Sequence, residues 1–282
     1  MRKVTRRRAL ATTGSALLAG LAGCASVADQ VSSDETTTST TLGNQSGADG
    51  GATTTTDASG SNQSEFGEGG DESTQETTVD ASSMSMPDGP LASASIPDEP
   101  GDATYAIMGS EDADVTARLF GSWKCPYTRD FVTNQLDGIV RDYVEPGDVA
   151  IEYRAVAYYR GDPFLGADAP RSARAGLSVW HTDPESYWEY FATVFANQPP
   201  ERYKWGTVGQ LLEFVEAADV SQEQQIRSAI TSGEYEQAVR ANTEAALEEQ
   251  ITTVPRLVVD GTVTAPTVDP EQTKRVLDRA TE

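Results

Sequence analysis

Cys125 is the residue whose type and position in this 282-residue sequence most clearly indicate chemistry. It follows an apolar, β-rich segment at residues 115–120 and precedes Pro126, which fits the first position of a helix. At such a helix N-cap, unpaired N–H groups and the helix dipole stabilise the thiolate, which is the nucleophilic form of cysteine. Lys124 and Arg129 are expected to add positive charge. The pattern predicts a reactive thiolate, and a buried structural cysteine is the alternative.

The elements that position Cys125 are predicted from apolar spacing and turn residues. Apolar side chains at three- and four-residue spacings predict a helix that begins at Pro126 and ends before Gly147. Strands are expected at residues 103–108, 115–120 and 149–159, and a hairpin at 255–265. Residues 170–250 have helical patterns, with helix starts at Asp183-Pro184, at Thr207 and at a capping box in residues 221–224. A last helix is expected to begin at Asp269-Pro270. Because strands and helices follow one another along the chain, the predicted class is α/β.

A second motif, Thr252-Thr253-Val254-Pro255, precedes the hairpin. With the turn Trp123-Lys124-Cys125-Pro126-Tyr127-Thr128, it resembles the cis-proline loop and active-site turn of DsbA-like proteins in the thioredoxin superfamily. The resemblance covers roughly residues 101–282. It implies a thioredoxin-like fold with an inserted helical subdomain at about residues 168–233.

The resemblance also implies a role for each matching residue. Cys125 matches the family's nucleophile, and Pro126 and Tyr127 match the dipeptide that tunes it. Pro255 matches the cis-proline, although an ordinary loop proline is the alternative. The remaining two expectations concern substrate contact: the Val254 backbone pairs with a bound peptide, and Trp123 is an aromatic residue at the rim of the site.

Two departures from the family pattern limit the mechanism. Thr128 replaces the second, resolving cysteine, and Leu119 stands where many relatives keep a buried acid for proton transfer. Thr128 is expected to donate a hydrogen bond to the thiolate. A lone thiolate still attacks a disulfide to form a mixed disulfide, so we expect monothiol exchange. Release then requires a second thiol on the substrate, a small thiol or another protein.

The N-terminus resembles an export signal. Residues 1–23 join a basic start containing Arg6-Arg7-Arg8 to an apolar stretch shorter than the roughly 20 residues that span a bilayer. The arginines resemble the twin-arginine class, and Leu21-Ala22-Gly23-Cys24 resembles a lipobox. The resemblance implies a lipid on Cys24 that holds the protein at the outer face of the cytoplasmic membrane. An ordinary cleaved signal is the alternative.

Residues 24–100 are predicted to be a disordered tether. From residue 25 they contain no Lys or Arg and are rich in Ser and Thr, and Phe66 is their only aromatic residue. Asn44 and Asn62 lie in glycosylation sequons. The folded domain is expected at residues 101–282.

The composition excludes several classes of protein. Two cysteines and one histidine exclude a disulfide scaffold and a multi-histidine metal site. A net charge of −23 disfavours nucleic acid as a partner, and no cofactor is expected. The acidic, lysine-poor composition is typical of proteins from concentrated salt.

Three functions remain open. The leading hypothesis is an extracytoplasmic thiol–disulfide oxidoreductase or isomerase, whose partners are exported proteins with cysteines or disulfides and a small thiol. The second is a redox-inactive binding module with the same fold. The third is a thiol peroxidase that forms a sulfenic acid at Cys125.

Overall fold

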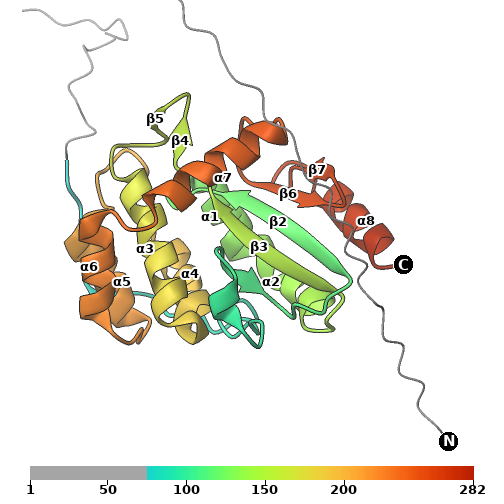
Figure 1. The fold of residues 1–282 in the computed structure, drawn as a ribbon, viewed down its shortest axis with the longest axis horizontal. Coiled ribbons are helices and arrows are strands. Elements are labelled where there is room, and N and C mark those ends of the chain that lie inside the picture. Colours follow the sequence, from blue (N-terminus) through green and yellow to red (C-terminus); the bar gives the residue numbers. More distant parts are fainter. Residues whose placement is uncertain (1–74) are drawn as a thin grey trace, which may run out of the picture. The chain divides into compact units, whose positions relative to one another are not determined.

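The computed structural model describes residues 75–282, which form a five-stranded sheet flanked by helices (Figure 1). The strand order is β1-β3-β2-β6-β7; β2 runs parallel to β3, and the other neighbouring pairs are antiparallel. The strands are β1 (Ile107–Met108), β2 (Val115–Gly121), β3 (Val149–Ala155), β6 (Arg256–Val259) and β7 (Thr262–Thr264). A separate hairpin consists of β4 (Tyr158–Tyr159) and β5 (Asp162–Pro163).

One long helix follows the turn that contains Cys125. It consists of α1 (Pro126–Phe131), a π-helical segment (Val132–Leu136), α2 (Asp137–Ile139) and a second π-helical segment (Val140–Val144). The later helices are α3 (Ala169–Thr182), α4 (Tyr187–Ala196), α5 (Val208–Ala217), α6 (Glu223–Ser232), α7 (Glu236–Glu248) and α8 (Pro270–Ala280). The predicted α/β class and the helical block between the two motifs are therefore confirmed.

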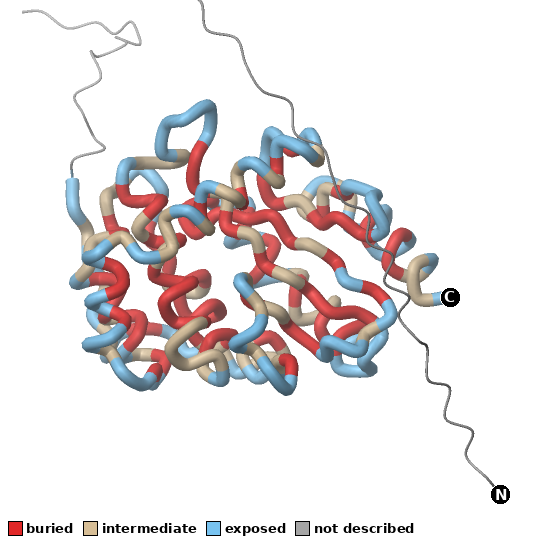
Figure 2. Tube along the Cα trace, viewed as in Figure 1, coloured by how far each residue is buried: buried red, intermediate tan, exposed pale blue. Residues whose placement is uncertain are grey.

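Successive side chains of a strand point to opposite faces of the sheet, so the buried apolar side chains form two separate clusters. Leu119 of β2 and Tyr153 of β3 belong to the main core, together with residues of the long helix. Phe120 points the other way and packs with Cys125 and with Ala246 of α7. In Figure 2 the buried residues follow β2 and β3 and the inward sides of the helices. Cys125 thus lies in the smaller cluster, on the α7 side.

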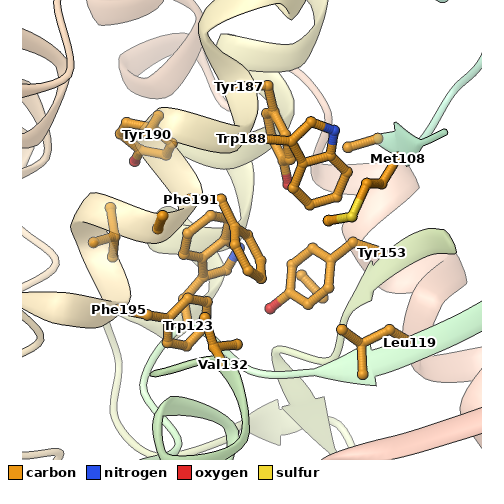
Figure 3. Packing of buried hydrophobic residues seen from close by; sticks show 14 of the residues in the cluster. Met108, Leu119, Trp123, Val132, Tyr153, Tyr187, Trp188, Tyr190, Phe191 and Phe195 are labelled. Carbon is orange, nitrogen blue, oxygen red and sulfur yellow. The ribbon is translucent and has the colours of Figure 1, made fainter. Parts of the chain in front are cut away.

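Aromatic side chains join the helical block to the sheet. The predicted core stripe of Tyr187, Trp188 and Phe191 on α4 is buried, at no more than 2% exposure. Figure 3 shows these rings gathered around Tyr153 of β3, whose ring centroid lies 4.8 Å from that of Phe191. The block is therefore held to the sheet by a shared apolar core.

Residues 75–100 correct the predicted boundary between tether and domain. Met84 and Leu91 are buried at 8% and 4% exposure and belong to the main core. The side-chain amides of Gln210 and Asn197 each accept a backbone N–H and donate to a backbone C=O, at Val79 and Ser85 respectively. The segment is polar on average, but its apolar residues pack against the main core and its backbone bonds to side chains of the domain, which docks it. The signal and the first part of the tether, residues 1–74, lie outside the described residues.

Two local predictions also differ from the structure. The expected strand at residues 103–108 is reduced to β1, because only its last two residues pair with β3. The expected capping box at residues 221–224 does not form. Gln222 occupies the N-cap of α6 in a left-handed conformation, and the Ser221 N–H instead donates to Asp183. A tertiary contact therefore replaces the local cap.

Two methionines of the docked segment provide a matched test of this boundary. Met84 is 8% exposed and Met86 is 44% exposed. We expect Met84→Ala to lower the free energy of unfolding by about 2 kcal/mol, because a buried apolar side chain is lost. Met86→Ala is expected to change it by less than about 0.5 kcal/mol. Urea unfolding of both variants measures the difference, and equal effects would mean that the segment does not pack.

Candidate active site

Cys125 occupies the N-cap of α1, as predicted. Its backbone is extended (φ −80°, ψ 123°), and Pro126 is the first helical residue. The Cys125 carbonyl accepts the Arg129 N–H at 3.0 Å, which closes the first helical turn. The side chain is 4% exposed, and the thiol is free and donates to the Val254 carbonyl at 3.6 Å. Cys125 therefore lies at the positive end of the helix dipole, and its sulfur bonds to the Val254 carbonyl rather than to an N–H group of the first turn.

The second motif lies against this cysteine. The Val254–Pro255 peptide bond is cis, which confirms the predicted conformation. Val254 is 8% exposed, and its carbonyl accepts the Cys125 thiol. Among the hydrogen bonds of residues 75–282, none uses the Val254 N–H as a donor. The loop thus has an unused backbone donor next to the sulfur.

An apolar pocket adjoins Val254. Its walls are the β4–β5 hairpin with the residues that flank it, the C-terminal part of α7 and the loop before Pro255; they include Tyr159, Phe164, Leu247 and Ile251. Burial is the main cause that raises the pKa of Tyr158 to about 12, and a hydrogen bond to Glu236 adds to it. Arg160 is the one charged side chain that lines the pocket. Only the part of the wall at residues 252–254 belongs to a sequence motif. The rest of the pocket was not predictable from the sequence, because its walls come from segments that are distant along the chain.

Thr128 and Tyr127 have very different surroundings. Tyr127 is 67% exposed, whereas Thr128 is fully buried on the inner side of α1. The Thr128 hydroxyl accepts the Ser122 N–H at 3.2 Å, which holds the turn before Cys125 against the helix. Its expected hydrogen bond to the thiolate is not among the contacts of the described residues and stays a prediction.

The two cations near Cys125 point away from it, contrary to expectation. The Lys124 side chain is 1% exposed, and its Nζ contacts Asp168 at 2.6 Å and donates to the Tyr203 carbonyl at 2.9 Å. Burial lowers the pKa of Lys124, and Asp168 opposes that shift. Arg129 donates to the Phe195 carbonyl at 3.1 Å. Both cations therefore join the turn and α1 to the helical block.

Trp123 also differs from its expected place at the rim of the site. It is 2% exposed and stacks on Phe195 of α4, with ring centroids 5.4 Å apart. Its carbonyl accepts a hydrogen bond from the Gln198 side chain at 2.7 Å. Because the indole is enclosed by the aromatic core, it is not available to contact a substrate (Figure 3).

Within residues 75–282, no group of three or more potential metal ligands is found, and no helix has the length and apolar character needed to cross a membrane.

Leu119 is buried at 1% exposure, and its neighbour across the sheet on β3 is Tyr153. Cys24, the residue expected to carry a lipid, lies outside the described residues.

Comparisons with known proteins agree with this architecture. A family model described as thioredoxin matches residues 102–279. A probable disulfide bond formation protein D of Bacillus anthracis is 26% identical over 178 residues, which are 63% of this chain and 78% of that protein. Disulfide bond formation protein D of Bacillus subtilis is 23% identical over 173 residues, or 61% of this chain and 75% of that protein.

Solved structures share the fold. Oxidised BdbD from Bacillus subtilis gives a TM-score of 0.58 at 23% identity and covers 67% of this chain and 98% of its own. DsbA of Chlamydia trachomatis gives a TM-score of 0.53 at 19% identity, with 62% of this chain and 90% of its own covered.

The buried Lys124–Asp168 pair provides a test of how the turn is held. We expect Asp168→Ala to lower the free energy of unfolding by about 3–5 kcal/mol, because it leaves the Lys124 charge buried and unpaired. Combining Asp168→Leu with Lys124→Met is expected to recover most of that loss. Urea unfolding measures each step. A double variant as unstable as the single one would show that another contact of Asp168, such as the hydrogen bond that it accepts from the Gly206 N–H at 2.7 Å, matters more than the ion pair.

Proposed function

The chain belongs to the thioredoxin family, and on that basis we propose that it is a thiol–disulfide oxidoreductase that acts through Cys125 alone. The observation that carries the proposal is the position of the Cys125 sulfur. It lies at the start of a helix and 3.6 Å from the carbonyl that precedes a cis-proline. The helix start stabilises a thiolate, and the loop presents a backbone edge beside it. The names of the relatives, disulfide bond formation proteins, support the same chemistry.

The proposed reaction is disulfide exchange. The Cys125 thiolate attacks one sulfur of a client disulfide, forms a mixed disulfide with it and expels the other sulfur as a thiolate, which takes a proton from water. A second thiolate, from the client or from a small thiol, then attacks the client sulfur of the mixed disulfide and returns Cys125 as a thiolate. When both thiols belong to the client, the net result is isomerisation, without a change in redox state.

The client is proposed to bind as an extended peptide. The Val254 N–H is free to pair with a backbone carbonyl, in the manner of an added strand. The pocket lined by Phe164 and Leu247 would take an apolar side chain near the client cysteine. Backbone pairing would let the site accept clients of many sequences, while the pocket would add a preference for apolar residues next to the client cysteine.

The proposed location is the outer face of the cytoplasmic membrane. The export signal at residues 1–23 and a lipid on Cys24 would anchor the chain there, and the Ser- and Thr-rich residues that follow would give the domain reach. Its partners would then be exported proteins that contain cysteines or disulfides.

A second candidate function is a binding module without redox turnover. The burial of Cys125, at 4% exposure, favours it, because a nucleophile must be reached by its substrate. The exposed Tyr127 and the open pocket would then bind peptides by contact alone.

Trapping of mixed disulfides separates the two functions. The reduced full chain is mixed with a cysteine peptide in disulfide linkage to glutathione, and intact mass spectrometry follows the adducts. We expect a long-lived adduct at Cys125, since no neighbouring thiol resolves it, and no adduct at this position in Cys125→Ser. In Thr128→Cys the adduct should be short-lived and be replaced by an internal disulfide. Absence of an adduct in the unaltered protein would favour the binding module.

The pocket is tested by Leu247→Ser, because Leu247 is 55% exposed and lines it. We expect adduct formation to slow about threefold or more with a peptide that has apolar residues beside its cysteine, since contact area is lost. The rate with glutathione disulfide should not change. Val263→Ser on β7, which alters an apolar residue of 37% exposure outside the pocket, is the control. Equal slowing with both disulfides would contradict a role in peptide recognition.

A further inference from the structure

The Tyr153 hydroxyl is a buried polar group without an assigned task. Tyr153 lies on β3, is 3% exposed and packs its ring edge-to-face against Trp123 and Phe191. Its oxygen has no hydrogen-bond partner among residues 75–282. An unsatisfied buried hydroxyl costs free energy, and a phenylalanine would fill the same space without that cost. The hydroxyl therefore needs an explanation other than packing.

The position of this hydroxyl points to the active-site turn. Gly121 is the last residue of β2, and a Cβ atom at this position would lie 3.3 Å from the Tyr153 oxygen and 2.9 Å from the Thr128 methyl carbon. The hydroxyl thus lies at the end of β2, next to the inner side of the first turn of α1. The absence of a side chain at Gly121 lets the phenol approach this turn.

The ionisable groups that act on the Tyr153 phenol are few. Burial raises its pKa well above the usual value, and a negative charge on Cys125 raises it further. Tyr187 also interacts with it, and burial likewise raises the pKa of Tyr187. The phenol therefore keeps its proton at every physiological pH. It is a hydrogen-bond donor and dipole, and does not transfer a proton.

We propose that the Tyr153 hydroxyl stabilises the Cys125 thiolate, acting through the low-dielectric space beneath the turn that contains Gly121 and Thr128. The inference rests on the proposed exchange function. In the mixed disulfide the Cys125 sulfur is neutral, and on release it regains a negative charge. A hydroxyl without another acceptor turns its proton toward that charge. Tyr153 is a positioning residue, since it acts through Cys125 and does not touch the client.

The test compares two buried tyrosines. Tyr190 on α4 also has a fully buried hydroxyl without a partner in the described part of the chain, but Cys125 is not among the causes of its raised pKa. Tyr153→Phe and Tyr190→Phe therefore remove similar groups, and only the first should affect the thiolate. The measurement is the rate at which iodoacetamide alkylates Cys125 in the full chain, followed on the Cys125 peptide by mass spectrometry.

We expect Tyr153→Phe to slow alkylation about threefold or more at pH 6, where the thiolate fraction limits the rate, and not at pH 10. Its unfolding midpoint should be unchanged or raised, because an unsatisfied polar group is removed. Tyr190→Phe should match the unaltered protein at both pH values. Equal rates for Tyr153→Phe and the unaltered protein at pH 6 would overturn the proposal, as would equal slowing at both pH values or in both variants.

This result is separable from that of the trapping experiment. If mixed disulfides form but Tyr153→Phe behaves like the unaltered protein, only the role of Tyr153 fails. If no mixed disulfide forms but Tyr153→Phe slows alkylation of Cys125 at pH 6, the exchange function fails and the proposed stabilisation of the thiolate by Tyr153 stands.

Discussion

The site depends on the antiparallel pairing of β6 with β2, in which Phe120 lies opposite Arg256. This register fixes the end of β2 and the start of β6 at the same edge of the sheet. The chain leaves β2 through the turn that contains Cys125 and enters β6 through Val254 and Pro255. A slip of one residue would turn every β6 side chain to the opposite face, and Leu257 would leave the main core. The burial of β6 therefore maintains the contact between the Cys125 sulfur and the Val254 carbonyl.

The loss of a second thiol and the loss of a buried acid are consistent with each other. A proton-transfer group is useful where a thiol must be deprotonated during the reaction cycle. Under the proposed function the dipole at the start of α1 favours the thiolate of Cys125, and Thr128 has no thiol to activate. Leu119 can then be part of the core without a chemical cost, and its neighbour Tyr153 remains protonated. In the proposed mechanism the site thus keeps a nucleophile and a backbone edge for a peptide, and Cys125 is the one cysteine among residues 75–282.

The parts of the structure that sequence reasoning predicted are those with local causes. A proline after Cys125 predicts the helix start, alternation and turn residues predict the hairpin, and both are present. The sequence does not predict where Trp123 and Lys124 point, because the direction of a side chain in a turn depends on what packs beneath it. The helical block covers this turn, so Trp123 enters the aromatic core and Lys124 meets Asp168. The docking of residues 75–100 was missed for a similar reason, since Gln210 and Asn197 lie more than a hundred residues away in the chain.

The burial of the Lys124 ion pair has a consequence for how the thiolate is stabilised. In a chain with a net charge of −23, an exposed lysine beside Cys125 would have many competing carboxylates. Its effect would also be screened by salt, since the Debye length falls to about 3 Å at 1 M. Lys124 is instead held by Asp168 at 1% exposure, away from the sulfur. In our proposals the groups left to act on Cys125 are the dipole at the start of α1 and the phenol of Tyr153, which is buried at 3% exposure and so is shielded from solvent ions. A thiolate stabilised by such dipoles should lose little of its reactivity as the salt concentration rises, whereas one stabilised by a surface cation would lose much of it.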